Sequence, residues 1–178
     1  MFEDFLKTIF RSIKLDKNLY KEPNTFGEMS LYYAGLIMIL DGIAGATALS
    51  NIYKTNIILS GATSIINWLV WALLIYVIGI KLFPDTDTKS NFKIILVTVG
   101  IAHAPGLLRF LAIVPEFVVP IIFLTQFWIF ASLVVGVRET LSFKSNIKSV
   151  GVIIIAFLVI AIVSLSFVME KINTLPLN

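Results

Sequence analysis

Residues 57 to 80 read IILSGATSIINWLVWALLIYVIGI, twenty-four consecutive positions without a charged side chain. An α-helix needs only about 20 apolar residues to cross the ~30 Å hydrocarbon core of a bilayer. Four further stretches of similar length are also mostly apolar, at 31–50, 94–114, 117–137 and 149–169. The sequence therefore predicts an all-α, polytopic membrane protein with five transmembrane helices.

The overall composition agrees with a lipid environment and limits the chemistry. Hydrophobic residues make up 58% of the 178 positions, charged residues only 14%, and the mean hydropathy is +0.94. The formal charge of +3 is not gathered on one basic segment, so we expect no nucleic-acid partner. Because the chain has no cysteine, disulfides, thiol nucleophiles and thiolate metal sites are excluded.

An amphipathic pattern precedes the spans, over residues 2–20. Its apolar residues recur at the spacing of one helical face, and Lys7, Arg11 and Lys14 share the opposite face. This pattern favours a helix lying in the headgroup plane, with the basic face toward anionic lipid. A helix packed on the cytoplasmic surface of the protein itself is the alternative. Residues 21–28 read as a turn into the membrane.

These patterns divide the chain into residues 1–28, a cytoplasmic helix and turn; residues 29–170, the five-helix domain; and residues 171–178, a short tail. Lysine and arginine are distributed unequally between the two sides of the membrane. Eleven of them fall on the side of the N-terminus and three on the other, counting Arg109 with the second group. The positive-inside rule then predicts a cytoplasmic N-terminus and an external C-terminus, in what we expect to be a bacterial cytoplasmic membrane.

Four polar residues are expected near the middle of the membrane. At about 1.5 Å of rise per helical residue, Asp41, Asn67, His103 and Gln126 all fall at similar depth. We expect them to form a polar layer inside the bundle. Such a layer can serve a proton or a ligand, or it can only fix helix packing by hydrogen bonds. The sequence leaves open which role applies, and whether Asp41 and His103 are charged.

The third span carries the most unusual stretch, GIAHAPGLLRFLAIVPE at residues 100–116. Pro105 removes a backbone donor and Gly106 adds freedom beside it, which predicts a kink. Arg109 is six residues beyond His103, so a continuous helix would place it about 9 Å nearer the outer face. There it would extend outward or pair with Glu116 at the outer rim.

No enzyme motif is present. A zinc protease motif needs two histidines and this chain has one, and neither a GxSxG motif nor a phosphate-binding glycine loop occurs. Asp85 and Asp87, in the loop PDTDTK, read as a solvated loop in preference to a divalent-ion site. We therefore expect no catalytic residues, no metal and no cofactor.

Four segments together resemble the Yip1-domain family of integral membrane proteins, in its small bacterial form. They are IKLDKNLYKE after the first helix, WLVWALLIYVIGIKLF ending span two, GIAHAPGLLRFLAIVP in span three, and FWIFASLVVGVRETLSF around the end of span four. The resemblance implies a five-helix membrane domain with a cytoplasmic N-terminus. Eukaryotic members, which act with Rab GTPases in vesicle traffic, carry a longer polar N-terminal region that is missing here, so that function is not implied.

The functional expectation is a non-enzymatic membrane protein that organises or binds other membrane components, with the lipid bilayer and other membrane proteins or a second copy of itself as partners. It could be an accessory subunit of a larger complex. The main alternative is a small transporter or proton-linked permease that uses the mid-membrane layer. Lipid handling, suggested by the amphipathic N-terminal helix, is a third possibility.

Overall fold

A computed structural model describes residues 2–21, 29–50, 54–112 and 114–173, with side chains up to residue 166. Its elements are, in chain order, α1 (Phe2–Ile13), α2 (Asn18–Lys21), α3 (Ser30–Leu49), α4 (Ile57–Tyr76), the π-helical η1 (Val77–Leu82), α5 (Phe92–Ala102), the 3-10 helix η2 (Ala104–Leu111), α6 (Pro115–Thr140) and α7 (Asn146–Asn173). The turn expected at residues 21–28 and the end of the tail, 174–178, lie outside the described residues apart from Lys21.

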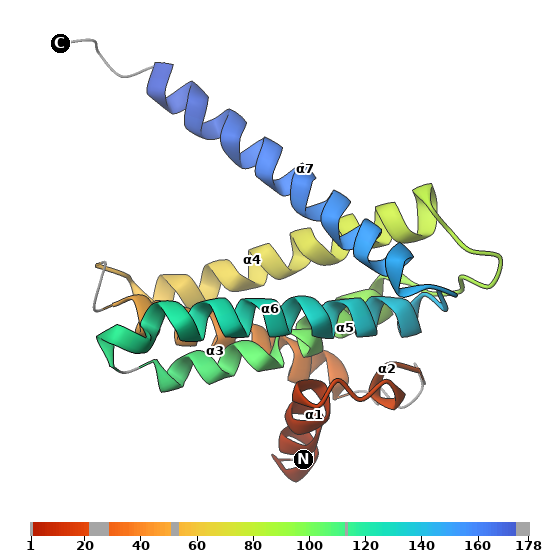
Figure 1. The fold of residues 1–178 in the computed structure, drawn as a ribbon, viewed down its shortest axis with the longest axis horizontal. Coiled ribbons are helices and arrows are strands. Elements are labelled where there is room, and N and C mark those ends of the chain that lie inside the picture. The colour runs from red at the N-terminus through yellow and green to blue at the C-terminus, as the bar shows by residue number, and fades with distance from the viewer. Residues whose placement is uncertain (1, 22–28, 51–53, 113, 174–178) are drawn as a thin grey trace.

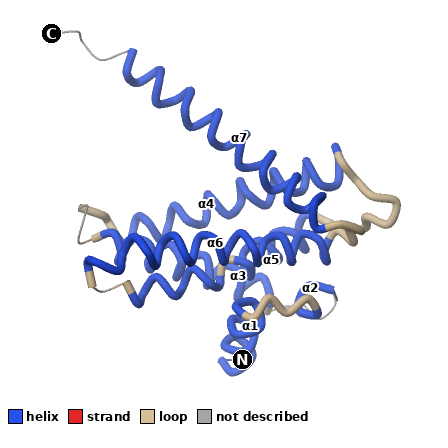
Figure 2. The backbone as a smooth tube through the Cα atoms, viewed as in Figure 1, coloured by secondary structure: helices blue, strands red, loops and turns tan. Residues whose placement is uncertain are grey.

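Five segments are long and apolar enough to cross a membrane, which confirms the predicted fold class. They are 30–49, 57–82, 92–111, 115–140 and 146–166, each within a few residues of its predicted bounds. Figure 1 shows four of them side by side, and α7 leaves this group at an angle. Every regular element of the described chain is a helix (Figure 2).

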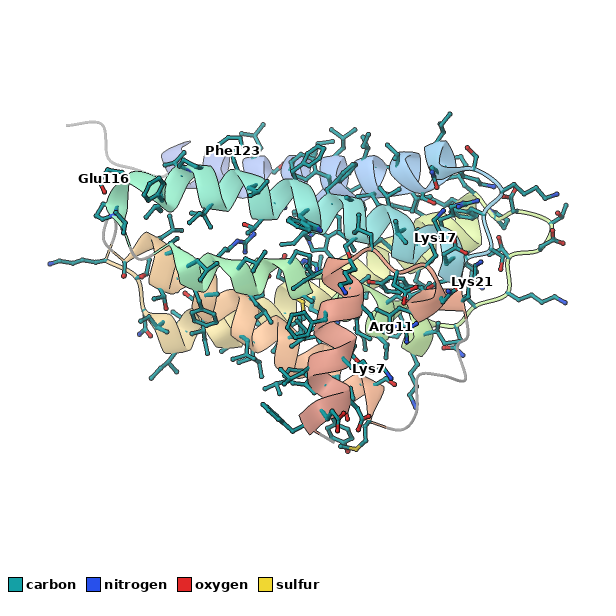
Figure 3. All side chains as sticks on the ribbon, turned by 60° about the horizontal axis from the view of Figure 1, so that its bottom comes forward. Lys7, Arg11, Lys17, Lys21, Glu116 and Phe123 are labelled. Carbon is teal, nitrogen blue, oxygen red and sulfur yellow. The ribbon has the colours of Figure 1, made fainter. Side chains whose placement is uncertain are left out.

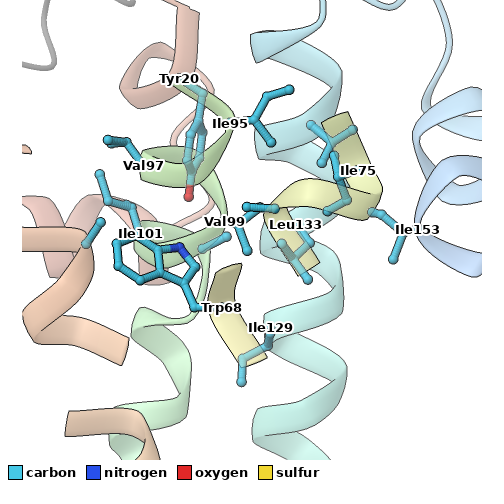
Figure 4. Packing of buried hydrophobic residues seen from close by; sticks show 14 of the residues in the cluster. Tyr20, Trp68, Ile75, Ile95, Val97, Val99, Ile101, Ile129, Leu133 and Ile153 are labelled. Carbon is cyan, nitrogen blue, oxygen red and sulfur yellow. The ribbon is translucent and has the colours of Figure 1, made fainter. Parts of the chain in front are cut away.

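Small residues on α3 allow it to approach α4 closely. A β-carbon added at Gly42 would lie 2.7 Å from the Ser60 carbonyl oxygen on α4. The core beside this contact is apolar, with Trp68 of α4 among branched side chains of α5 and α6 (Figure 4). The indole of Trp68 donates to the Leu96 carbonyl on α5, at 2.7 Å. This bond satisfies a buried polar group that would otherwise be costly in hydrocarbon.

The N-terminal helix is shorter than the sequence pattern suggested. α1 ends at Ile13, and the chain then turns through Leu15, which has a φ of 55°. Asp16 stabilises the turn because its carboxylate accepts from Arg11 at 2.7 Å and from the backbone N–H of Asn18 at 2.9 Å. The hydrogen bond from Arg11 lowers the pKa of Asp16 below its usual value. This local polar cluster ends the helix before residue 20.

α1 lies below the bundle in Figure 1, crosswise to its helices, and hydrogen bonds hold the C-terminal end of α1 against the bundle. The buried hydroxyl of Ser12 donates to the Ile101 carbonyl at 2.8 Å and lies 3.2 Å from both the Tyr20 and Ser132 hydroxyls. The indole of Trp128 donates to the last carbonyl of α1 at 2.9 Å. The geometry thus matches the alternative of a helix packed on the protein, and a position in the headgroup plane stays a prediction. Phe2, Leu6 and Phe10 remain exposed on α1.

Within its described side chains, which end at residue 166, α7 buries residues only in its first half. Val152, Ile153 and Ala156 are buried against the other helices. From Phe157 to residue 166 its side chains are exposed or only partly covered, because the helix leaves the bundle at an angle (Figure 1). α4 and α6, which α7 touches near its start, make almost no direct contact with each other. The two helices therefore leave a gap that the outer half of α7 does not cover.

The loop that carries Asp85 is attached to the start of α7. The ammonium group of Lys148 lies 2.9 Å from an Asp85 carboxylate oxygen and also donates to the Pro84 carbonyl at 3.0 Å. The other Asp85 oxygen accepts from the backbone N–H of Lys144 at 3.4 Å. The hydrogen bond from Lys148 lowers the pKa of Asp85. The sequence predicted a solvated loop but not this attachment, because Asp85 and Lys148 are far apart in the sequence.

Candidate functional site

The third span changes helix type at its proline. The α-helix ends at Ala102, and the chain continues as a 3-10 helix from Ala104 to Leu111. Pro105 has no N–H to donate, so the α-helical ladder cannot pass through it. The next hydrogen bond instead joins the Gly106 N–H to the His103 carbonyl at 2.8 Å, three residues back. The kink expected here takes the form of this change of helix.

The 3-10 geometry decides which residues face α3. With about three residues per turn, Gly106, Arg109 and Ala112 share one face. Gly106 lies against Asp41 of α3, where a β-carbon would collide with the carboxylate. Ala112 belongs to a small buried cluster with Ala48 at the C-terminal end of α3. Arg109, between them, is therefore directed into the bundle at the level of Asp41.

Arg109 and Asp41 form an ion pair within the membrane span. One guanidinium N–H donates to an Asp41 carboxylate oxygen at 2.8 Å, and the two side chains are only 13% and 9% exposed. The guanidinium also donates to the Thr125 hydroxyl at 3.1 Å and to the Gln126 amide oxygen at 3.0 Å, both on α6. Pairing and these further bonds offset the cost of charge at this depth. The network connects three spans.

The other two predicted residues have different surroundings. The Nδ1 atom of His103 lies 2.8 Å from the Val99 carbonyl. A carbonyl only accepts, so Nδ1 carries a proton and a neutral ring would leave Nε2 as an acceptor. Asn67 of α4 is exposed, and its carboxamide makes no hydrogen bond within the described part of the chain. It lies ten residues from the start of α4, which is about 15 Å along the helix axis.

All four predicted layer residues and Arg109 line one cavity of about 840 Å³. One wall is polar: Ser60, Thr63, Ser64 and Asn67 follow one face of α4 from its outer end to mid-span. Thr55, in the link before α4, also lines the cavity. The polar wall thus runs from the end of the bundle that the charge distribution places outside to the ion pair.

The opposite wall is apolar and faces the gap beside α7. Phe123 and Phe127 of α6 line the cavity, yet their side chains are 75% and 74% exposed. Ile154 and Phe157 complete this wall from α7. In Figure 3, Phe123 is directed away from the bundle, which is consistent with its exposure. The cavity is therefore accessible from the side, between α4 and α6, as well as polar within.

The structure corrects one expectation about partners. Asp41 pairs with Arg109, while His103 lines the same cavity. Arg109 is not at the outer rim with Glu116, which is exposed at the outer end of α6 (Figure 3). The error came from applying α-helical spacing beyond Pro105. In an α-helix, six residues rotate a side chain to another face, whereas in a 3-10 helix they complete two turns.

Sequence reasoning missed two features of the site. Thr125, beside Gln126, gave no signal because an isolated threonine in a span usually bonds its own helix, as Thr125 also does through its bond to Ile121. The polar stripe on α4 was detectable, since Ser60, Ser64 and Asn67 recur at three- and four-residue spacing. No group of three or more His, Asp and Glu side chains in the described part of the chain could hold a metal ion.

Comparison of the chain with known protein families, curated proteins and solved structures gives no match.

Proposed function

We propose that this chain is a non-enzymatic integral membrane protein that binds another membrane component in the cavity between α4, α6 and α7. The component enters from the lipid phase through the gap beside α7. The unequal distribution of lysine and arginine supports a cytoplasmic N-terminus and an external C-terminus, and a bacterial cytoplasmic membrane is the proposed location. In this orientation the polar wall of the cavity belongs to the outer half of the membrane.

The observation that carries the proposal is a pair of exposed carboxamides about halfway along their spans. Asn67 and Gln126 lie ten and eleven residues from the outer ends of α4 and α6, so both are about 15 Å inside. The Asn67 amide has no partner in the described chain, and Gln126 uses only its oxygen, toward Arg109. Polar groups at this depth are costly without a partner. A bound component with hydrogen-bonding groups supplies one.

We propose a binding role without catalysis because Asp41 and His103, the two candidate acid–base groups of the cavity, already have partners in the protein. The Asp41 carboxylate is engaged by Arg109, and His103 is bonded to its own helix. Neither side chain is joined to a hydroxyl nucleophile in the described structure. These groups are placed to hold a molecule, and their arrangement offers no activated nucleophile.

The natural absence of cysteine makes a crosslinking test direct. A benzophenone attached at Phe127→Cys, which lines the cavity, is compared with the same label at Leu124→Cys, which is also exposed on α6 but lies off the cavity. After irradiation in native membranes, mass spectrometry identifies the adducts. We expect one defined lipid or protein adduct, several-fold enriched at position 127. Equal adducts at both positions would refute binding in the cavity.

Transport is a second candidate, favoured by the polar wall that leads from Thr55 to the ion pair. A proton-linked permease would use Asp41 and His103, both of which line the cavity. Purified protein in liposomes with an internal pH dye tests this function. Transport predicts a proton flux that falls with His103→Ala, whereas binding alone predicts a flux equal to that of empty liposomes and unchanged by the substitution.

The relationship to Yip1-domain proteins remains part of the proposal. It rests on the quoted segments, of which the third-span stretch is the most specific, and on a five-span architecture. The proposal includes a larger assembly, in which a second copy of the chain or another membrane protein covers the gap beside α7. A protein adduct at position 127 would favour that arrangement over a lipid.

A further inference from the structure

The charges of the cavity limit the charge of its ligand. Among the described residues that line it, Asp41 is the only carboxylate and Arg109 the only guanidinium, and they neutralise each other at 2.8 Å. His103, the remaining titratable residue of the lining, is bonded through Nδ1 to a carbonyl of its own helix. A ligand with a net charge would have no opposite charge left to meet it at this depth, where an unpaired charge is costly. The cavity therefore suits a molecule whose net charge is zero.

Free N–H groups in the cavity are found on Arg109, Asn67 and Gln126. A guanidinium has five N–H groups, and three bonds from Arg109 to protein side chains leave two N–H groups free. The amide of Asn67 has two N–H groups without a partner in the described chain, and Gln126 has two more. The hydroxyls of Thr55, Ser60, Thr63 and Ser64 donate to backbone carbonyls, so the rest of the polar wall offers acceptors. The group that matches Arg109, Asn67 and Gln126 therefore carries acceptor oxygens, such as ester carbonyls or a phosphate, and a hydroxyl or an amine of the same ligand donates to the wall.

The apolar wall specifies the rest of the ligand. Phe123 and Phe127 from α6, with Ile154 and Phe157 from α7, form an apolar surface opposite the polar wall of α4. Hydrocarbon chains can lie along this surface and leave through the gap beside α7. A volume of about 840 Å³ is within the usual range of small-molecule sites, so it holds a polar group and the adjoining part of its chains.

Resting on the proposed function, we infer that the cavity binds one lipid-like amphiphile of zero net charge, with its acceptor-bearing polar group at Arg109, Asn67 and Gln126 and its chains against the α6 and α7 wall. Two lipid classes share this chemistry. An uncharged diacylglycerol offers ester carbonyls, and a zwitterionic phosphatidylethanolamine offers a phosphate and an ammonium group. Phosphatidylglycerol, which is anionic, does not fit.

The test measures which lipid stays bound. The purified protein is reconstituted with equal fractions of diacylglycerol, phosphatidylethanolamine and phosphatidylglycerol, extracted in mild detergent and examined by native mass spectrometry. We expect a single retained lipid of one of the first two classes, enriched at least about tenfold over the anionic lipid, given the cost of an unpaired charge at this depth. The class retained identifies the source of the acceptor group. Preferential retention of phosphatidylglycerol would overturn the inference.

Substitutions outside the ion pair locate the bound lipid. Asn67→Leu and Gln126→Leu remove free amide donors from exposed positions, and Ile66→Leu is the matched control, exposed on α4 but outside the cavity. The amount of lipid retained should fall about threefold in each variant, because one hydrogen bond in a membrane usually changes a binding constant by about that factor. Lipid retention by the control variant should stay unchanged. Unchanged retention in folded Asn67→Leu and Gln126→Leu would refute the site.

The outcomes separate this inference from the broader proposed function. A protein adduct at position 127 together with no retained lipid leaves binding in the cavity standing and overturns the lipid ligand. Equal crosslinking at positions 127 and 124 would refute binding in the cavity, and it would refute the lipid inference as well. A retained lipid of zero net charge that forms the adduct at position 127 supports both.

Discussion

The ion pair between Asp41 and Arg109 predicts strongly non-additive stability. Removing one partner leaves the other charge buried, at a cost of about 3–5 kcal/mol for such pairs. We expect about 3 kcal/mol for Asp41→Asn, since an asparagine oxygen still accepts one hydrogen bond, and a similar loss for Arg109→Met. The double variant leaves no unpaired charge, so its loss should be no larger than that of either single variant. The coupling energy is then about 3 kcal/mol.

The measurement is reversible unfolding of the purified protein in mixed micelles, titrated with a denaturing detergent and followed by tryptophan fluorescence. A matched control is the pair of Asp87 and Lys144, which are 3.9 Å apart and 68% and 70% exposed. Asp87→Asn and Lys144→Met should show no measurable coupling, because solvent screens exposed pairs. Additive losses for Asp41 and Arg109, within about 0.5 kcal/mol, would show that the two charges do not depend on each other.

Three further predictions follow from the packing and the loops. Gly42→Ala places a methyl group against the α4 backbone and should cost about 1–3 kcal/mol of unfolding free energy, whereas Gly151→Ala in α7 meets nothing within 4 Å and should cost nothing or stabilise the helix slightly. Because Lys148 lowers the pKa of Asp85, their contact persists above the ordinary carboxylate pKa of about 4 and is lost only as the pH falls through the lowered folded-state value. Protection of residues 83–91 against amide exchange, taken relative to the intrinsic exchange rate, should therefore fall only in strong acid, and Asp85→Asn should lower it at every pH above that range; identical pH profiles of protection would refute this. Trp128→Phe removes the bond that holds the end of α1, so exchange over residues 2–13 should quicken while exchange in α4 and α5 stays unchanged; no change in α1 would contradict that role.

The spans and the depth of their polar residues could be predicted because both depend on simple lengths. A run of about 20 apolar residues specifies a crossing helix, and the helical rise places Asp41, Asn67, His103 and Gln126 at one level. The same reasoning failed for Arg109 because it assumed one helix type through Pro105. The 3-10 helix places Arg109 on the face of Gly106, toward α3, where its long side chain reaches Asp41. Pattern alone predicts the face of a residue only while the helix type is unchanged.

The path of α7 could not be predicted from its sequence. Its outer half is apolar on all sides, and that composition suits contact with lipid as well as contact with other helices. Among its described side chains, up to residue 166, the buried ones are Ser149, Val152, Ile153 and Ala156, all in the first half. The accessible side of the cavity, and hence its candidate ligand, follows from this three-dimensional arrangement, which no local pattern encodes.

The buried contact between Ser12 and Ser132 also bears on the order of events during synthesis. The two residues are 120 positions apart, and a ribosome that adds about 5–20 residues per second needs roughly 6–24 s to make the second after the first. During that interval α1 has left the ribosome, but its docking site on α5 and α6 does not yet exist. The nascent helix has an apolar face, a basic face and a membrane nearby. The pattern of α1 therefore predicts a position in the headgroup plane during synthesis, and the docked position of α1 forms once α5 and α6 are complete.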